Sequence, residues 1–279
     1  MTTTLSDTLR QAAAAGLDRL DAQKLLLHAL GRSPHDRAWL IAHEGDALPC
    51  AAQSAWSTLL ARRLAGEPVA YLLGQQEFFG LALQVDARVL VPRPDTETLV
   101  QWAIDLLPGL GPAPRVIDLG TGSGAIALAL ARHQPGLDIT ATDASPDALA
   151  VAQVNARTLG LPVRFATGHW LDAVPGETFD LIAGNPPYIA EGDPHLPALV
   201  HEPSSALVSG PDGLDDIRTI VARATQALKP GGWLLLEHGH DQAPRVRALL
   251  VSAGFDHVST HTDLAGIERC TGGQWPERR

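Results

Sequence analysis

The stretch RVIDLGTGSG, at residues 115–124, joins a short apolar run to a loop that holds three glycines. The run at 115–119 predicts a strand, and a helix is expected to begin near Ala125. Glycines between them let a ligand approach bare backbone, and the free N–H groups of a helix start attract negative charge. The stretch therefore predicts a strand, a ligand-binding loop and a helix, in that order.

The same alternation of short apolar runs and helical stretches continues along the chain from about Asp95. Expected strands lie at 115–119, 138–142, 163–166, 179–183, 233–237 and 256–260, with helical stretches between most of them. Repeated alternation of this kind is typical of a parallel sheet with helices on both faces. We expect an α/β fold with a doubly wound, mostly parallel, Rossmann-like sheet that binds ligands at the carboxyl ends of its strands.

The residues before this α/β region follow a different pattern. From Leu5 to about Leu64 the chain is rich in alanine and leucine at helical spacing, with breaks near Gly16, Gly31 and Gly45, which predicts about four helices. Short aromatic and β-branched runs around residue 80 predict a hairpin. We expect a helical domain at 1–70, a β-hairpin linker at 71–94 and the α/β domain at 95–279.

Composition narrows the class of protein. Of the 279 residues, 45% are hydrophobic and 19% are charged, with 26 glycines and 21 prolines, as in globular α/β proteins. No segment approaches ~18 uncharged apolar residues, and the first residues lack a basic start followed by an apolar run. We expect a cytoplasmic protein that makes no membrane contact. The two cysteines lie far apart in sequence, which favours reduced thiols.

The charge balance argues against a nucleic-acid partner. A net charge of -10 opposes a broad electrostatic grip on phosphates, although a local basic patch stays possible. Eleven histidines raise the alternative of a metal site, with the densest group between His238 and His261. No H-E-x-x-H or Cys/His finger pattern occurs, so core or solvated histidines are favoured and we expect no metal.

Two features indicate a nucleoside ligand. Gly120, Gly122 and Ala125 satisfy the G-x-G-x-x-A variant of the dinucleotide fingerprint. Asp143 ends the second expected strand, where a carboxylate can accept both ribose hydroxyls; its alternative is a helix cap before Pro146. This placement suits NAD and S-adenosylmethionine equally.

A tetrapeptide after the expected strand at 179–183 decides between NAD and S-adenosylmethionine. It is Asn185-Pro186-Pro187-Tyr188. The lone pair of a planar NH2 group is delocalised, so an enzyme that alkylates it must hold the nitrogen and oppose that delocalisation. The Asn185 side-chain oxygen and the Pro186 carbonyl offer two acceptors, while the prolines stiffen the turn and Tyr188 offers a flat wall. The motif favours methyl transfer to a planar nitrogen over hydride transfer, with a proline-rich turn as its alternative.

With these motifs the chain resembles, over nearly its whole length, the N5-glutamine methyltransferases of peptide chain release factors, the HemK or PrmC type. The tetrapeptide is shared with adenine-N6 DNA and guanine-N2 RNA methyltransferases. The narrower likeness therefore depends on the flanking stretches VPRPDTE at 91–97 and Glu202-Pro203 to Leu214. The resemblance implies S-adenosylmethionine-dependent methylation of the glutamine in the Gly-Gly-Gln motif of class I release factors, which act in translation termination. It also implies that the sheet of this chain is of the methyltransferase type.

The resemblance also implies roles for single residues. S-adenosylmethionine, leaving as S-adenosylhomocysteine, would be bound by Gly120, Thr121, Gly122, Ser123, Gly124, Asp143, Trp170 and Asn185. Substrate glutamine would be bound by Asn185, Pro186, Pro187 and Tyr188, of which Asn185, Pro186 and Tyr188 are the candidate catalytic residues. For Trp170 a buried aromatic with no ligand is an equal alternative. Arg93 and Glu97 could shape the substrate mouth, but a proline-started helix with a charged first turn is favoured.

The same resemblance suggests the protein partner, and several alternative functions remain. The helical domain would dock the release factor, or else simply cap the sheet, and a monomer without direct nucleic-acid binding is expected. Gly272-Gly273-Gln274 repeats the target motif near the end of the chain, where a glycine-rich turn is favoured over a pseudosubstrate. An RNA guanine-N2 or DNA adenine-N6 methyltransferase, an NAD oxidoreductase and a non-enzymatic nucleotide-binding adaptor remain as alternatives.

Overall fold

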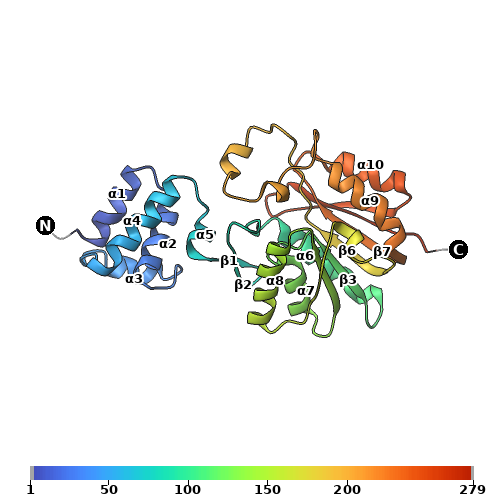
Figure 1. Ribbon diagram of the computed structural model, residues 1–279, viewed down its shortest axis with the longest axis horizontal. Coiled ribbons are helices and arrows are strands. Elements are labelled where there is room, and N and C mark those ends of the chain that lie inside the picture. The colour runs from blue at the N-terminus through green and yellow to red at the C-terminus, as the bar shows by residue number, and fades with distance from the viewer. Residues whose placement is uncertain (1–2, 278–279) are drawn as a thin grey trace. The chain divides into compact units, whose positions relative to one another are not determined.

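A computed structural model describes residues 3–277 of the chain (Figure 1). It divides into two compact units, one that ends at Gln75 and one that begins at Gln76. Within the described residues, no helix combines the length and the apolar composition that crossing a bilayer requires.

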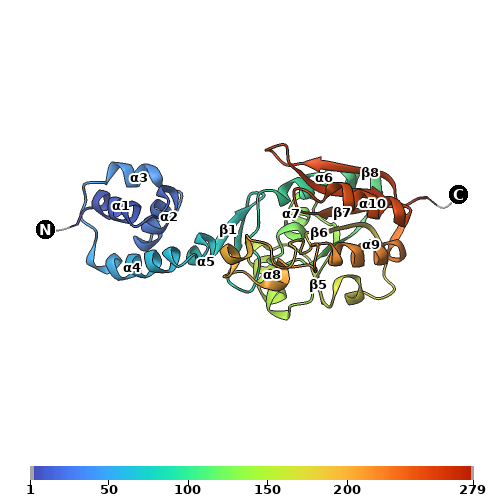
Figure 2. The ribbon, with the colours of Figure 1, turned by 90° about the horizontal axis from the view of Figure 1, so that it is seen from above.

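The first unit is a small helical bundle (Figure 2). Its helices are α1 (Leu5–Ala14), α2 (Arg19–Ala29), α3 (Arg37–Ala42), α4 (Cys50–Leu64) and α5 (Val69–Leu73). Thr4 and Asp7 form a capping box at the start of α1, and the carboxylates of Asp18 and Asp36 cap α2 and α3. Leu25, Leu26, Leu27, Leu40 and Trp56 share its core. The expected helices before residue 64 are present, and α5 follows them.

The second unit is built on a seven-stranded sheet with the order β5-β4-β3-β6-β7-β9-β8. Its strands are β3 (Arg115–Leu119), β4 (Asp138–Asp143), β5 (Arg164–Thr167), β6 (Phe179–Gly184), β7 (Leu228–Glu237), β8 (Asp256–Thr262) and β9 (Glu268–Gln274). Strands β3 to β7 pair in parallel, whereas β9 runs antiparallel between β7 and β8. The predicted α/β class with a mostly parallel sheet is confirmed.

Helices cover both faces of this sheet (Figure 1). The α-helices are α6 (Thr96–Leu106), α7 (Ala125–His133), α8 (Pro146–Leu159), α9 (Asp215–Ala227) and α10 (Ala243–Ala253). Short 3-10 turns are η1 (Leu107–Leu110), η2 (Trp170–Ala173), η3 (Leu196–Leu199) and η4 (Ser204–Ala206). The α6 to α8 group packs on one face, and α9 and α10 pack on the other.

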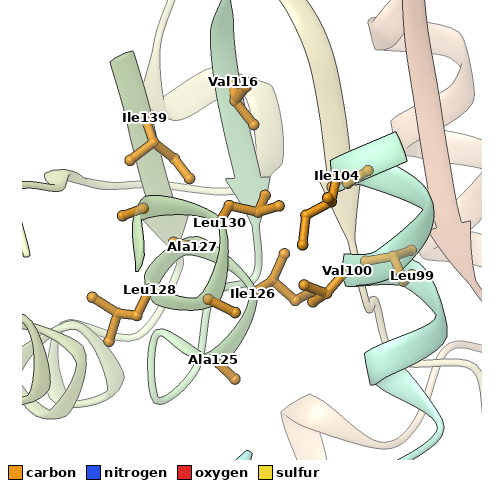
Figure 3. Packing of buried hydrophobic residues seen from close by; sticks show 14 of the residues in the cluster. Leu99, Val100, Ile104, Val116, Ala125, Ile126, Ala127, Leu128, Leu130 and Ile139 are labelled. Atoms are coloured by element: carbon orange, nitrogen blue, oxygen red, sulfur yellow. The ribbon is translucent and has the colours of Figure 1, made fainter. Parts of the chain in front are cut away.

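Alternation along each strand produces these two cores. Val116 of β3 belongs to the cluster with α6 and α7, whereas the next residue, Ile117, belongs to the cluster with α9 and α10. Figure 3 shows Val116 and Ile139 of the sheet beside Ile126 and Leu130 of α7. Because both faces are buried, the strands are apolar on both sides, which explains why their sequence reads as continuous apolar runs.

Two strands before the main sheet form a sheet of their own, β1 (Gln75–Phe78) and β2 (Leu81–Gln84). They flank residue 80, where the sequence predicted a hairpin. Asn155 of α8 is buried and connects this hairpin to the glycine loop. Its amide accepts from the Gln84 N–H at 2.7 Å and donates to the Ser123 carbonyl at 2.8 Å. The hairpin thereby supports the loop after β3.

The Gly-Gly-Gln sequence at 272–274 is not a turn. It forms the end of β9, with Gly272 opposite Leu235 and Gly273 opposite Leu234 of β7. A Cβ on Gly272 would lie 2.5 Å from Leu235 Cδ2 and 2.8 Å from the Trp102 ring. The prediction of a glycine-rich turn was wrong, because these glycines serve close packing of a strand between two others.

Gly272→Ala should therefore lower the free energy of unfolding by roughly 2 kcal/mol or more, since the contacts are with a packed strand and ring. Gly109→Ala is the control, because its Cβ meets nothing within 4 Å. Urea denaturation of both variants checks this, and equal stability of the two would contradict it.

Candidate active site

Three loops meet at the carboxyl edge of the sheet. In the parallel register, Leu119 of β3 lies opposite Thr142 of β4 and Gly184 of β6. The residues that follow these positions include Gly120, Asp143 and Asn185. All three line one hollow of about 470 Å³, a size that suits a small ligand. We call it the main hollow.

The glycine loop exposes its backbone to the main hollow. Gly120, Gly122 and Gly124 have φ angles of 68°, 55° and 88°, which side chains other than glycine rarely adopt. Gly120 and Gly122 line the hollow. Thr121, Ser123 and Gly124 do not line it, since all three are buried beneath the loop.

Those buried residues hold the loop in shape. The Thr121 N–H donates to the Thr142 carbonyl at 2.9 Å, and the Thr121 hydroxyl donates to Asp118 Oδ2 at 2.6 Å. Gly124 precedes α7, and a Cβ there would lie 2.8 Å from Leu128. Thr121 and Gly124 thus fix the backbone that Gly120 and Gly122 present.

Asp118 is a buried carboxyl that the sequence did not single out. Its Oδ2 also accepts from the Ala127 N–H at 3.1 Å, whereas its Oδ1 has no hydrogen-bond partner within residues 3–277. Burial raises the pKa of Asp118 to about 7, and the nearby charge of Asp143 adds to the rise, against the two hydrogen bonds. The carboxyl is therefore poised to respond to a positive charge on a ligand.

Asp143 ends β4, the strand that pairs directly with β3. Its Oδ2 accepts from the Gly122 N–H and its Oδ1 from the Ser145 N–H, both at 2.9 Å. Ser145, not Asp143, caps α8, because the Ser145 hydroxyl accepts from the Ala148 N–H. The helix-cap alternative for Asp143 is thus wrong, and each of its oxygens keeps a lone pair for a ligand hydroxyl.

Trp170 forms a wall of the hollow. Its ring lies against Gly120, where a Cβ would be 2.9 Å from the ring, and its indole N–H donates to Asp216 Oδ1 at 3.1 Å. Only 9% of the residue is exposed, although it borders the hollow. Trp170 is thus largely buried but borders the hollow on one side, and its contact with a ligand stays a prediction.

The turn after β6 separates the main hollow from a second one. Asn185 and Pro187 line the main hollow, whereas Asn185 and Tyr188 line an adjoining hollow of about 380 Å³. Pro186 is buried and lines neither hollow. The Gln242 amide donates to the Tyr188 carbonyl at 2.9 Å, which fixes the far end of the turn. Asn185 is thus shared by both hollows.

Comparison with known proteins shows to which family this chain belongs. A release factor glutamine methyltransferase of Bordetella pertussis is 51% identical over 274 residues, covering 97% of this chain and 99% of that protein. Another, from Xylella fastidiosa, is 49% identical and covers 96% and 97%. The chain belongs to the release factor glutamine methyltransferase family. Family models agree, with a PrmC N-terminal domain at 3–74 and a methyltransferase small domain at 104–211.

A solved structure supports the fold of this family member. A T. thermophilus 16S rRNA N2 G1207 methyltransferase, solved in complex with AdoMet and guanosine, has a TM-score of 0.55 at 21% identity. The match covers 72% of this chain and 49% of that one. At this identity the likeness concerns the fold.

Arg93, whose role the sequence left open, lines the adjoining hollow. Its guanidinium pairs with the carboxylate of Glu202, which is nearly inaccessible, and Glu202 Oε2 also accepts from the Val91 N–H at 3.0 Å. Glu97 instead accepts from the Phe79 N–H at 2.9 Å. In this family member Arg93 lines the hollow and is paired there with the buried Glu202, whereas Glu97 binds the hairpin.

Two histidines of the group between His238 and His261 contact other side chains of the fold. His238 is buried and bonds Thr271 at 2.7 Å, and His261 stacks on Trp102 with ring centroids 3.9 Å apart. Over residues 3–277, His, Cys, Asp and Glu nowhere gather in a group of three or more that could hold a metal ion.

Asp118→Asn should change how stability depends on pH. Between the unfolded pKa of 3.8 and the folded pKa of about 7, the unfolded state loses a proton that the folded state keeps. The free energy of unfolding of the wild type therefore falls as pH rises through this window, at up to about 1.4 kcal/mol per unit. The variant should lack this part of the fall. Urea denaturation at pH 4.5 and 7.5 tests it, and parallel pH dependence in the two proteins would refute it.

Proposed function

We propose that this protein uses S-adenosylmethionine to methylate the side-chain nitrogen of the glutamine in the Gly-Gly-Gln motif of class I peptide chain release factors. The observation that carries the proposal is the position of Asn185, which borders both hollows. A group transferred from a ligand in one hollow to an acceptor in the other passes beside this residue. Family membership supplies the identity of the acceptor.

The main hollow fits S-adenosylmethionine. Gly120 and Gly122 present bare backbone for the methionine part, Asp143 offers free lone pairs to ribose hydroxyls, and Trp170 offers a flat wall for the adenine. When bound, S-adenosylmethionine supplies an electrophilic methyl group on a sulfonium. Asp118 is buried under the loop, and a positive charge in the hollow would favour its ionised form.

The adjoining hollow fits a glutamine side chain. Leu90, Ile189, Leu199 and Leu207 give it apolar walls for the two methylenes, and Asn185 stands at its border. We assign the acceptor's NH2 group to the Asn185 side-chain oxygen and the Pro186 carbonyl. Two fixed acceptors hold the nitrogen and favour its pyramidal form, in which the lone pair is available.

Catalysis in this proposal is mainly positioning. Holding the amide in a near-attack geometry can supply about 7 kcal/mol of the barrier reduction. The nitrogen becomes acidic only as its new bond to carbon forms, so no strong base has to act beforehand. The proton leaves late, to water or to one of the two acceptors.

The first unit, by itself, is proposed to dock the body of the release factor. Its likeness to the PrmC N-terminal domain over residues 3–74 supports this assignment. A docking domain at 1–70 is thus combined with a methyltransferase domain at 95–279. We further propose a monomer that acts on a protein in the cytoplasm and makes no direct contact with nucleic acid.

The deciding experiment is transfer of labelled methyl from S-adenosylmethionine to a purified, unmodified release factor, with total RNA as the competing substrate and peptide mapping of the product. Label on the Gly-Gly-Gln glutamine is expected. Label on RNA alone would overturn the proposal and favour a base amine as acceptor.

Asn185→Ala should lower kcat by on the order of 100-fold, the scale for losing one positioned polar group at a transition state. Gln101→Ala, which removes an exposed amide from α6, is the control and should keep wild-type turnover. Single-turnover methyl transfer measures both. Wild-type turnover in the Asn185 variant would refute the clamp.

Gly120→Ala should weaken S-adenosylhomocysteine binding by at least about tenfold, because a Cβ would both strain the backbone and strike Trp170. Gly136→Ala is the matched control. Gly136 also has a positive φ, of 86°, but its Cβ would meet nothing within 4 Å. Calorimetric titration separates the two effects, and equal affinities in the two variants would contradict the role of the Trp170 wall.

A further inference from the structure

A second buried carboxyl lies directly behind the Asn185 turn. Glu237 ends β7, and the residue before it, Leu236, lies opposite Gly184 of β6. Glu237 is only 1% exposed, and on its other side it pairs with Cys270 of β9. The register therefore fixes this carboxyl beside the first residue of the turn. The proposed chemistry does not use it.

Thr96 lies between this carboxyl and the side chain of Asn185. The Tyr188 hydroxyl donates to Glu237 Oε1 at 3.4 Å, whereas Glu237 Oε2 has no hydrogen-bond partner within residues 3–277. Thr96 lies close enough for a side-chain hydrogen bond that lowers the pKa of Glu237. Thr96 Oγ1 in turn accepts from the Asn185 side-chain NH2 group at 3.2 Å. Thr96 begins α6 and is 4% exposed. Residues from a helix start, a turn and a strand end thus form one buried chain.

The direction of this chain fixes the direction of the Asn185 amide. A hydroxyl has one hydrogen, and a carboxylate only accepts. Once the Thr96 hydrogen is donated to Glu237, only lone pairs of Thr96 face Asn185. Asn185 must then turn its NH2 group towards Thr96, which directs its oxygen away from Thr96. The two ends of an amide have nearly the same shape, so hydrogen bonding alone decides between the two orientations.

We propose that Glu237 is a positioning residue, which acts through Thr96 to hold the Asn185 amide with its oxygen towards the acceptor. This inference rests on the proposed function. It deepens that function by restricting the acceptor to groups that donate N–H hydrogens, such as a primary amide. A reversed Asn185 would oppose one NH2 group to another and would leave the acceptor nitrogen only the Pro186 carbonyl.

The protonation state of Glu237 adds a readout that a purely structural residue would not have. Burial raises the pKa of Glu237 to about 7, the charge of Asp95 adds to the rise, and Thr96, Tyr188 and Arg269 oppose it. Burial also raises the pKa of the neighbouring Cys270 thiol and of the Tyr188 phenol, so both stay neutral. A protonated Glu237 can donate to Thr96, which frees the Thr96 hydrogen for the Asn185 oxygen and reverses the amide.

The test compares variants of the full-length enzyme on a release factor. Thr96→Val and Glu237→Met should each lower kcat at least about tenfold while leaving S-adenosylhomocysteine affinity within about twofold. Thr96→Ser, which keeps the hydroxyl, should restore kcat. Thr98→Val, a nearby change on α6 outside this chain of bonds, is the control and should match the wild type. Thermal unfolding and ligand binding establish that each variant is folded.

Two further results distinguish positioning from packing. The double variant should be no slower than Thr96→Val alone, because both changes break one chain of bonds. Wild-type kcat should fall as pH drops below about 7, and Thr96→Val should lose this fall. If the wild type is active and Thr96→Val keeps both its kcat and the fall of kcat below about pH 7, the positioning role of Glu237 is refuted. The proposed function then still stands. If the wild type methylates no glutamine, the proposed function itself fails.

Discussion

The parallel register of β3, β4 and β6 is the constraint on which the site depends. Because Leu119 lies opposite both Thr142 and Gly184, three loops that are far apart in sequence start at one edge. A Cβ on Gly184 would lie 2.9 Å from the Leu119 carbonyl, so even the approach of two strands requires glycine there. A slip of one residue would move Asn185 away from the main hollow and turn the strand side chains to the opposite faces.

This edge is built at a cost to stability. Three glycines with positive φ shape one loop, and two carboxyls, Asp118 and Glu237, are buried with one oxygen of each lacking a partner within residues 3–277. Burial of both raises their pKa to about 7. Neither group improves the fold by itself, since burying a carboxylate is unfavourable. Their retention at the strand ends is explained by what they orient, the glycine loop in one case and the Asn185 turn in the other.

Local sequence patterns predicted most of the helices and strands and the ligand-binding motifs. They did not predict the contacts of the residues that hold those motifs in place. Strand ends predicted the glycine loop, Asp143 and Asn185, because each motif directly follows an apolar run. Thr96 and Glu202 lie in stretches that carry the family resemblance, but their contacts, and Glu237 altogether, have no local signal. Each contacts a residue about 90 to 110 or about 50 positions away, which only the folded chain brings near. Strand β9 was missed because glycine replaces the branched residues that mark a strand, and close packing against Trp102 and Leu235 requires it.

The adjoining hollow offers few polar groups to a substrate. Apolar walls with Asn185, Tyr188 and Arg93 can select a side chain that carries an amide, but they cannot distinguish one glutamine from another. Arg93 is already paired with Glu202, which leaves it little freedom to read the flanking sequence. Selection of a single glutamine in one class of protein therefore requires contacts outside the hollow. An added recognition surface, the role that we propose for the first unit, would meet that requirement without changing the chemistry at Asn185.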